Sequence, residues 1–323
     1  MSRYARQIAV IGQPAQDRLR KARVLMVGAG GLAAPSLPYL VGAGLGAVRL
    51  VDADVVSLSN LHRQTLFAEA DIGRPKVTVA AQRMKALNPD CTVEPAPEVL
   101  DPANAADLVA GCDVVLDCAD SFAASYILSD TCQAADVPLI SASVVGLEGY
   151  VGGFCAGAPS LRALFPDLPA RMESCDSAGV LGPLVGIIGA LQAQMAVAVI
   201  TGAQPNPLGQ LTTYDAATMR FGGFRFDNAP EPAHRPAFIA RTALCDDDLI
   251  IDLRAAHEGP LPHSAAHRIA PGQPMPEPEQ GQRMVLCCRS GLRAWNAAEG
   301  VAKQTNIEIA LLALGDETGE GNP

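Results

Sequence analysis

A run of glycines near the start of the chain is its clearest chemical signal. Gly28, Gly30 and Gly31 follow the apolar residues 24–27, and Asp52 follows a second apolar run. Glycines let a backbone approach phosphate closely, and a helix that starts there presents N–H groups to an anion. An acid about twenty residues further on is placed to bind a ribose hydroxyl. The pattern predicts a nucleotide site.

Polar and charged side chains, most of them cationic or amide, come next along the chain. They are Asp54, Asn60, Arg63, Gln64 and Lys76. Their alternative role is to solvate an exposed loop. Lys76, however, opens a predicted helix, where its charge opposes the helix dipole, so it needs an anion beside it. The glycine turn alone fits an NAD-type oxidoreductase equally well, but these cations favour a nucleotide whose phosphates react.

Alternating strand and helix patterns position these residues. Predicted strands cover residues 24–28, 48–52, 114–117 and 139–143, and predicted helices cover 32–41, 77–87 and 126–135. Short apolar strands separated by helices indicate an α/β fold with a Rossmann-like, mostly parallel sheet and helices on both faces. In such sheets ligands bind at the carboxyl ends of the strands. We expect Asp52 and residues 117–120 to meet there.

An uncharged segment covers residues 178–200 and is long enough to pass for a membrane span. It contains Pro183, Gln192 and Gln194, and it stands alone. We therefore predict a buried helix or a subunit interface, because a helix that is apolar all round is buried. Two closing strands are expected at residues 211–215 and 219–226.

The chain of 323 residues has room for two domains at about 150 residues each. Residues 228–237 are proline-rich and polar, which is typical of an extended linker. We predict one domain over residues 1–227 and a smaller α/β domain over 238–323, with strands at 249–254 and 284–288. The acidic residues 315–323 are expected to be disordered.

Composition excludes some functions. The formal net charge of -10 argues against nucleic acid as a partner. Nine scattered cysteines without a disulfide spacing favour a reduced, cytoplasmic protein. Residues 1–6 lack the apolar stretch of a signal peptide, and we expect no association with a membrane.

Longer motifs, in order, resemble the MoeB/ThiF family, the bacterial relatives of ubiquitin-activating enzymes. The resemblance runs from Arg3-Tyr-Ala-Arg6-Gln7 to about Phe226. It includes the glycine turn, Asn60-x-x-Arg63-Gln64, Ala70-Asp-Ile-Gly-Arg-Pro-Lys76, Asp117-Cys-Ala-Asp120-Ser, and Cys175 ahead of Ala178-Gly-Val-Leu-Gly-Pro-Leu-Val-Gly. It implies ATP- and Mg²⁺-dependent adenylation of the C-terminal glycine of a small ubiquitin-like sulfur carrier that ends in Gly-Gly.

The same resemblance implies a role for each residue. Asp52 corresponds to the ribose-binding acid, Asp120 to the carboxylate that handles Mg²⁺, and Arg6 to an arginine that reaches the neighbouring subunit's site in a homodimer. Asn60, Arg63, Gln64 and Lys76 correspond to residues around the ATP phosphates. The alternative for Asp117 and Asp120 is to cap the helix that follows.

The chain departs from the family pattern at two places. Ala33-Ala34 replaces the usual Gly-Ser, which is compatible with close helix packing. Many members also bind zinc through two C-x-x-C pairs, but here Ser160 and Ala163 stand at the first pair and Cys245 has no partner three residues away. Zinc needs four N or S ligands, so we expect none.

Several cysteines are candidates for sulfur chemistry. Cys175 matches the family cysteine that links to the carrier or relays sulfur, and a helix start there would favour its thiolate; the alternative is a core cysteine. Cys112, Cys118 and Cys132 lie in predicted core elements and are expected to pack.

The C-terminal part contains Cys287-Cys288-Arg-Ser-Gly-Leu-Arg293 between an apolar strand and a helix. It resembles a rhodanese active loop, and Asp252-Leu-Arg254 resembles that fold's early signature. From Cys288 to Arg293 the loop has six residues, the size that suits a persulfide, and Cys287 is then the last strand residue. From Cys287 to Arg293 the loop has seven residues, as in cysteine phosphatases. The sequence favours Cys288 as sulfur carrier. The alternative is a degenerate docking domain.

These patterns together predict an adenylyltransferase that activates a sulfur carrier, with a sulfur donor such as a cysteine desulfurase as a further partner. Thiocarboxylate for thiamin thiazole or molybdopterin synthesis is the expected product, and the missing zinc cysteines favour the thiamin branch. The alternatives are a tRNA-modifying dehydratase of the same superfamily, a non-catalytic scaffold that binds nucleotide and carrier, and an NAD-dependent oxidoreductase.

Overall fold

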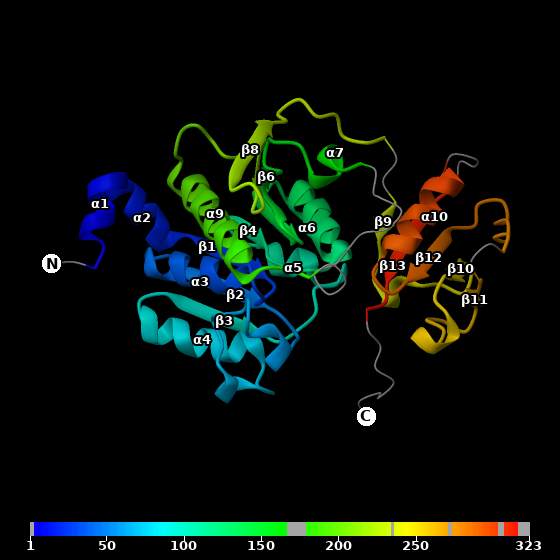
Figure 1. The fold of residues 1–323 in the computed structure, drawn as a ribbon. Helices are drawn as coiled ribbons and strands as arrows, with labels where there is room; N and C mark the ends of the chain where they lie inside the picture. The colour runs from blue at the N-terminus through cyan, green and yellow to red at the C-terminus, as the bar shows by residue number, and fades with distance from the viewer. Residues whose placement is uncertain (1–2, 167–178, 234–235, 271–272, 303–306, 316–323) are drawn as a thin grey trace.

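The computed structural model describes residues 3–166, 179–233, 236–270, 273–302 and 307–315 (Figure 1). Helices α1 (Ala5–Ile11) and α2 (Gln13–Lys21) precede a large sheet. The strands of this sheet are β1 (Arg23–Val27), β2 (Ala47–Val51), β3 (Thr92–Ala96), β4 (Val114–Asp117), β5 (Leu139–Val145), β6 (Glu148–Phe154), β7 (Gln210–Asp215) and β8 (Arg220–Arg225). They lie in the order β3-β2-β1-β4-β5-β6-β7-β8.

Five strands of the large sheet are parallel, from β3 to β5, and β6, β7 and β8 continue it antiparallel. Its helices are α3 (Ala33–Gly42), α4 (Lys76–Leu87), α5 (Ala105–Val109), α6 (Phe122–Ala135), α7 (Leu161–Leu164) and α9 (Gly182–Thr201). The predicted mostly parallel α/β sheet is confirmed. The antiparallel pair β5 and β6 was not predicted as a hairpin.

Helices cover both faces of the sheet, because successive strand residues point to opposite sides. In β1, Val24 and Met26 pack with α3, α4 and α9, whereas Leu25 and Val27 pack with α5 and α6. A strand that is buried on both faces is apolar throughout, and this accounts for the continuous apolar runs in the sequence.

The central register brings three chain segments to one edge of the sheet. Val27 pairs with Val51 in β2 and with Asp117 in β4. Gly28, Asp52 and Cys118 therefore leave the sheet side by side. The strand order reverses at β1, with β2 and β3 on one side of it and β4 and β5 on the other. Ligands bind at such a point in open α/β sheets.

Helix α9 is the uncharged segment that the sequence singled out. It is long and apolar enough to cross a membrane by length and composition alone, and half of its most apolar window is buried inside the protein. Leu184, Val185 and Ile188 belong to the core between α3 and the sheet. The prediction of a buried helix is confirmed for this side of α9.

Helix α6 begins four residues earlier than predicted. Ser121 has an extended backbone, and its hydroxyl accepts a hydrogen bond from the N–H of Ala124 at 3.4 Å. This serine is the N-cap, so neither Asp117 nor Asp120 caps the helix through its side chain.

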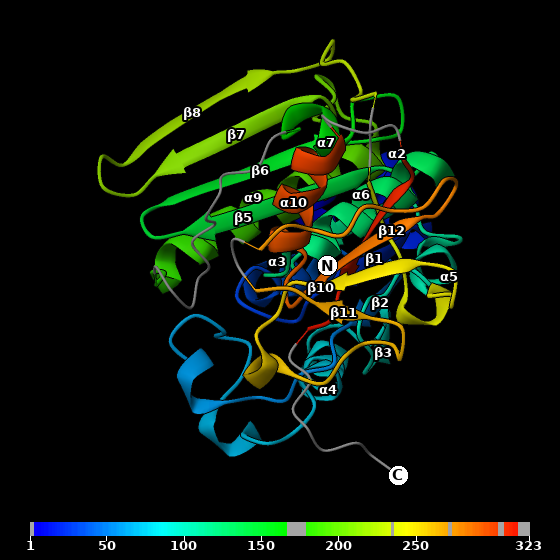
Figure 2. The ribbon, with the colours of Figure 1, turned by 90° about the vertical axis from the view of Figure 1, so that its right-hand side faces the viewer.

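A second, five-stranded sheet follows. Its elements are β9 (Ala237–Phe238), β10 (Leu249–Asp252), β11 (His267–Arg268), β12 (Met284–Cys288), α10 (Leu292–Ala302) and β13 (Ile309–Ala313). The strands are parallel in the order β11-β10-β12-β13-β9. This unit, called the small module below, lies beside α6 in Figures 1 and 2. Strand β12 covers the predicted residues 284–288, and Cys288 rather than Cys287 is its last residue, because Cys288 still pairs with Ala313.

Candidate functional site

The glycine turn after β1 is held by Asp52. The Asp52 carboxylate accepts hydrogen bonds from the N–H groups of Ala29 and Asp54, both at 2.7 Å. Burial raises the pKa of Asp52, while nearby Lys76 and these hydrogen bonds act in the opposite direction. Gly28 has a φ of 94°, and a Cβ there would lie 2.5 Å from the carbonyl oxygen of Cys118. Only glycine fits, so the turn and the end of β4 are in direct contact.

Lys76 opens α4, as predicted, and is almost fully buried. Its ammonium lies 2.8 Å from the carboxylate of Asp54, and its N–H donates to the Asp54 carbonyl at 2.9 Å. The anion that the sequence argument required is therefore supplied by the chain itself. Asp54 and Lys76, both predicted to bind nucleotide, are joined to each other and through Asp52 to the glycine turn.

The amide and arginine side chains lie on the segment that covers the glycine turn. The carbonyl of Asn60 accepts from the N–H groups of Arg63 and Gln64, at 3.1 and 2.9 Å. A Cβ on Gly30 would lie 3.6 Å from Nε2 of Gln64, and one on Gly31 would meet Val185. Because Gly30 and Gly31 have no side chains, Gln64 and Val185 can pack closely against the turn.

Two polar groups of this segment, the side-chain amide of Gln64 and the guanidinium of Arg63, bear on ligand binding. Oε1 of Gln64 is buried and has no hydrogen-bond partner among the described residues. Buried polar atoms are normally paired, so an unpaired acceptor at a strand-end crevice is a place where a ligand donor fits. The guanidinium of Arg63 lies 2.8 Å from Nε2 of His62 and is half-buried.

Asp117 and Asp120 follow β4 and have opposite surroundings. Asp117 is fully buried, and burial raises its pKa to about 6 against the opposing hydrogen bonds of Ser125 and Ser141. Its carboxylate accepts from the Ser141 hydroxyl at 2.7 Å and from the N–H of Ala119 at 3.2 Å. Asp120 is exposed. The buried acid therefore fixes the end of β4, and the exposed acid is the one that can reach a ligand.

Gln192 is a positioning residue whose role is not evident from the sequence, where it is only a polar residue in an apolar helix. Its amide donates to the carbonyls of Asp117 and Ile140, at 2.7 and 3.0 Å, and its Oε1 accepts from the Cys118 thiol at 3.2 Å. It joins α9 to the ends of β4 and β5. A single amide within a buried apolar helix was the available signal.

Two predicted residues are not brought into this cluster. Arg6 lies exposed on α1, and no hydrogen bond in the described part of the chain joins it to the strand-end residues. Cys175 lies outside the described residues. Cys112, Cys118 and Cys132 are buried, as the packing interpretation predicted.

Residues at the position of the family's first zinc pair make other contacts. The Ser160 hydroxyl accepts from the N–H of Ala163 at 3.3 Å and donates to Glu231 at 2.7 Å. No group of three or more histidine, cysteine, aspartate or glutamate side chains forms a metal cage within the described ranges.

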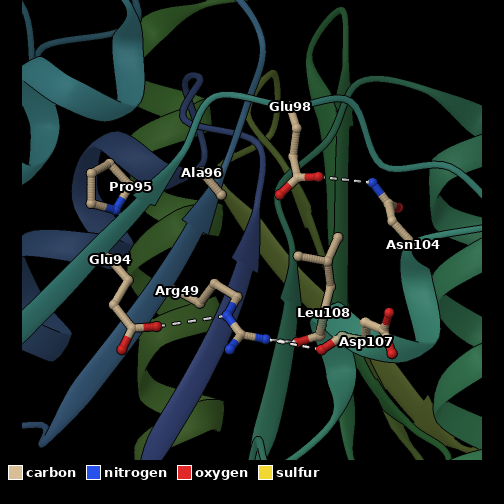
Figure 3. Close-up of a pocket in the computed structure, with 8 residues that line it drawn as sticks. All are labelled: Arg49, Glu94, Pro95, Ala96, Glu98, Asn104, Asp107 and Leu108. Carbon is tan, nitrogen blue, oxygen red and sulfur yellow. Dashed lines mark hydrogen bonds and ion pairs between the residues drawn. The ribbon is translucent and has the colours of Figure 1, made fainter.

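A cavity of about 350 Å³ opens elsewhere, between β2, β3 and α5 (Figure 3). Arg49 spans it, with Nε 3.6 Å from the Glu94 carboxylate and Nη1 donating to the carbonyls of Asp107 and Leu108. The lining contains none of the predicted nucleotide residues. Because Arg49 is occupied by these internal contacts, the cavity is not the candidate site.

In the small module, Cys288 ends β12 and its sulfur lies inside the loop that follows. Sγ accepts hydrogen bonds from the N–H groups of Gly291 and Ala294, at 3.1 and 3.4 Å. Arg293, at the end of the loop, pairs with Glu258. By contrast, burial raises the pKa of the Cys287 thiol to about 12. Of the two adjacent cysteines, Cys288 is the one that backbone N–H groups cradle.

The doubly wound fold and its strand-end site define a nucleotide-binding protein of the class that binds ligands at a topological switch point. The chain belongs to the ThiF family, which matches residues 4–235. Its relatives are named as adenylyltransferases, and the chain is an enzyme of this class.

Three relatives and one solved structure illustrate the match. The SAMP-activating enzyme E1 of Haloferax volcanii is 38% identical, over 72% of this chain and 87% of its own. Molybdopterin-synthase adenylyltransferase of Escherichia coli is 41% identical, over 68% and 90%. Adenylyltransferase and sulfurtransferase uba4 of Aspergillus terreus is 43% identical, but over only 44% of its length. E. coli MccB with ATP has a TM-score of 0.64 at 21% identity, over 72% of this chain and 74% of that one, which shows the fold alone.

Proposed function

We propose that this enzyme uses ATP to adenylate the C-terminal glycine of a small ubiquitin-like sulfur carrier. One observation carries the proposal: the glycine turn, Asp52 and Asp120 leave β1, β2 and β4 at one edge of the sheet, with Arg63 and Lys76 on the segments beside them. The relatives named for SAMP activation and molybdopterin synthase support this substrate class.

The residues present fit a nucleotide. The turn contains Gly28, Gly30 and Gly31, which have no side chains of their own to keep phosphate from the backbone, and Asp52 offers carboxylate oxygens to ribose hydroxyls. The unpaired Oε1 of Gln64 accepts from a nucleotide N–H or O–H donor. This buried acceptor is the structural support for nucleotide binding that does not depend on the relatives.

The residues also fit Mg²⁺ held in part by the substrate. Mg²⁺ is commonly bound by one or two carboxylates together with phosphate oxygens. Asp120 is the exposed carboxylate at the end of β4, and it makes no hydrogen bond or ion pair within the described residues. When bound, the ion neutralises charge on the phosphates.

In the reaction, a carboxylate oxygen of the carrier's last glycine attacks the α-phosphorus of ATP, and pyrophosphate leaves. Two anions approach each other, so nearby cations lower the barrier. Arg63 and Lys76 supply positive charge on the nucleotide side. Arg6 serves the site of a second subunit, so we propose that the enzyme works as a homodimer.

We propose further that the small module supplies sulfur. A persulfide on Cys288, loaded by a donor such as a cysteine desulfurase, attacks the acyl-adenylate carbonyl, AMP leaves, and an acyl disulfide joins the carrier to Cys288. A second thiol then attacks Sγ of Cys288 and breaks the S–S bond, which releases the carrier's thiocarboxylate and leaves a disulfide that an external thiol reduces. The backbone donors around Sγ stabilise negative charge on that sulfur. Cys175 is the candidate second thiol. This assignment makes the module a short rhodanese-like sulfurtransferase, as the uba4 relative's name suggests for that protein.

The proposed carrier is of the molybdopterin-synthase type, with a thiamin-type carrier as the alternative. Two relatives are named for molybdopterin synthase. We place the reaction in the reducing cytoplasm, since the eight described cysteines are all free thiols.

Exchange of labelled pyrophosphate into ATP, with each carrier type present, tests the proposal. Wild type should exchange label with one of the carriers. Asp120→Asn should lower exchange about a hundredfold or more. Asp113→Asn, at the other end of β4, is the matched control and should stay near wild type. Absence of exchange with every carrier would sink the adenylation proposal.

The sulfur step is tested separately. Cys288→Ala should leave exchange intact and stop thiocarboxylate formation, measured by the mass of the carrier. If Cys288→Ala abolished exchange while Asp120→Asn spared it, the assignment of the two steps to the two sites would be wrong.

A further inference from the structure

Two helices of this chain start at chemically important loops and pack against each other. Helix α6 begins at Phe122, two residues after Asp120, and α10 begins at Leu292, within the loop that holds the Cys288 sulfur. Figures 1 and 2 both show the small module beside α6. The first turn of α6 is therefore adjacent to both loops.

Aromatic rings fill this contact. The ring of Phe122 meets Phe238 of β9 edge-on at 6.0 Å and Trp295 of α10 at 5.6 Å. Tyr126, one turn along α6, lies 4.8 Å from Trp295. Tilted and edge-to-face contacts at these distances are favourable beyond the area that they bury. These four residues, called the docking cluster, hold the small module on α6.

Arg162 of α7 contacts two members of the docking cluster. Its side chain is only 1% exposed, and it binds both carboxylate oxygens of Asp130, at 2.6 and 2.7 Å. Its guanidinium lies over the rings of Tyr126 and Trp295, at 5.1 and 4.8 Å. A desolvated cation between two rings stabilises both contacts. Arg162 belongs to the large unit but holds a side chain of the small module.

In the docked arrangement the Cys288 thiol has no access to solvent. Cys288 is 0% exposed and faces the core that includes Ala123, Phe238 and Trp295, whereas Cys287 faces a separate core. Gly291, the residue that closes the loop over Sγ, is packed so tightly that a Cβ there would lie 2.6 Å from Phe238 and 3.5 Å from Ala123. The tight contact with Phe238 lies within the small module, and Ala123 in the first turn of α6 is the residue of the large unit that rests against the loop at Gly291.

We infer that docking of the small module on α6 closes the Cys288 loop, and that Cys288 reacts with another molecule only when the module separates from α6. Arg162 is the positioning residue that sets this equilibrium. The inference concerns access to the thiol and holds whatever the loop transfers, so it is independent of the adenylation proposal.

The connection between the two units allows such movement. Strand β8 ends at Arg225 and β9 begins at Ala237, with no helix or strand in the described residues between them. Separation removes Ala123 and its neighbours in α6 from the core that Cys288 faces, whereas the core that Cys287 faces consists of residues of the small module alone. Cys287 and Cys288 face opposite sides of β12, so the reactivity of Cys288 alone reports separation, and the reactivity of both reports unfolding of the module.

Alkylation by iodoacetamide, followed by peptide mass spectrometry of the full chain, tests the inference. Cys245 is exposed and serves as the reactive reference, and Cys287 reports unfolding of the small module. In wild type, Cys288 should react far more slowly than Cys245. Arg162→Ala should raise the Cys288 rate roughly tenfold or more, because it leaves Asp130 and the rings without their cation, while Cys287 stays protected.

Arg83→Ala is the matched control. It removes a different arginine–aspartate pair, with Asp71, on the far side of the large unit, and should not change the Cys288 rate. Trp295 is the chain's only tryptophan, so its fluorescence reports docking directly. Its emission should shift to longer wavelength in Arg162→Ala and not in Arg83→Ala.

Two results, one with wild type and one with Arg162→Ala, would overturn the inference. One is a wild-type Cys288 that reacts as fast as Cys245. The other is an Arg162→Ala protein in which Cys287 and Cys288 gain reactivity together, since that pattern means the small module unfolds rather than separates. Tyr126→Leu, on the α6 side, repeats the test with a change that leaves Arg162 in place, and equal protection of Cys288 in this variant and wild type would also contradict the inference.

Discussion

The ammonium of Lys76 lies 2.8 Å from the carboxylate of Asp54, and the two side chains differ sharply in exposure, at 5% and 72%. A buried cation at the start of α4 is neutralised by an acid that solvent can reach. If triphosphate binds here, it competes with Asp54 for Lys76 or adds to the pair. The enzyme with and without nucleotide then differs in which anion neutralises the charge of Lys76.

Removing the Asp54 charge should therefore destabilise the enzyme without nucleotide. Asp54→Asn leaves a largely buried ammonium without an anion, and we expect a loss of about 1 kcal/mol in the free energy of unfolding, since one partner is exposed. Saturating ATP should restore part of this loss. Urea denaturation with and without ATP measures both. Asp17→Asn, from an exposed pair with Arg20, is the control and should change stability by less; equal losses in the two variants would contradict the assignment.

Asp52→Asn should damage the glycine turn and nucleotide binding together. Asp52 accepts from two backbone N–H groups, of Ala29 and Asp54, and an amide can accept only on its oxygen. One buried donor then faces an NH₂ group, at a cost of about 1–3 kcal/mol in stability. We expect the KM for ATP in pyrophosphate exchange to rise about tenfold, from the same loss. An unchanged KM would remove Asp52 from the nucleotide site.

Gly28→Ala should lower the stability of the protein more than Gly73→Ala does, although the two substitutions strain the backbone in the same way. Gly28 and Gly73 have φ values of 94° and 83°. A Cβ on Gly73 meets nothing within 4 Å, whereas one on Gly28 lies 2.5 Å from the Cys118 carbonyl oxygen. Gly73→Ala should cost about 1–2 kcal/mol, and Gly28→Ala about 1–3 kcal/mol more, because β1 and β4 must move apart. Thermal unfolding of both variants measures the difference, and equal shifts would show that this contact is not tight.

Asp117 should make stability fall as pH rises from about 4 to about 6. Burial raises its folded pKa to about 6 from 3.8, so in this window the folded protein holds a proton that the unfolded chain has lost. A difference of this size corresponds to about 3 kcal/mol. Asp117→Asn keeps hydrogen-bonding atoms beside Ser141 and has no proton to lose. Urea unfolding from pH 4 to 7 should show a flatter profile in the variant; identical slopes would mean that Asp117 does not titrate in this range.

Much of the fold follows from local patterns. The double-sided burial of β1 explains why residues 24–27 are apolar without alternation, and the same reasoning applies to Val114–Asp117. The start of α6 was placed four residues late although the local signals were present, since Ser121 is a favoured N-cap residue and Ala123 and Ala124 are good helix formers. The cradle around Cys288 was predictable from the loop's length, since its donors are three and six residues away.

Contacts across long separations were not predictable in the same way. The position of Lys76 at a helix start indicates that it needs an anion, but nothing in the sequence identifies that anion as Asp54, 22 residues earlier. Arg162 passed unnoticed, since nothing near it in the chain indicates that it is buried between Tyr126 and Trp295. Gln192 was noted only as a polar residue in an apolar helix.

The sequence by itself determined the sheet, the glycine turn, the acids that follow β2 and β4, and the family, because strand and helix periodicity and turn chemistry act between near neighbours in the chain. Only the tertiary structure decided which charges neutralise each other and which surface covers Cys288. Those contacts join residues that the chain brings together only by burying its apolar faces, and the energy of a buried charge or thiol depends on every group packed around it.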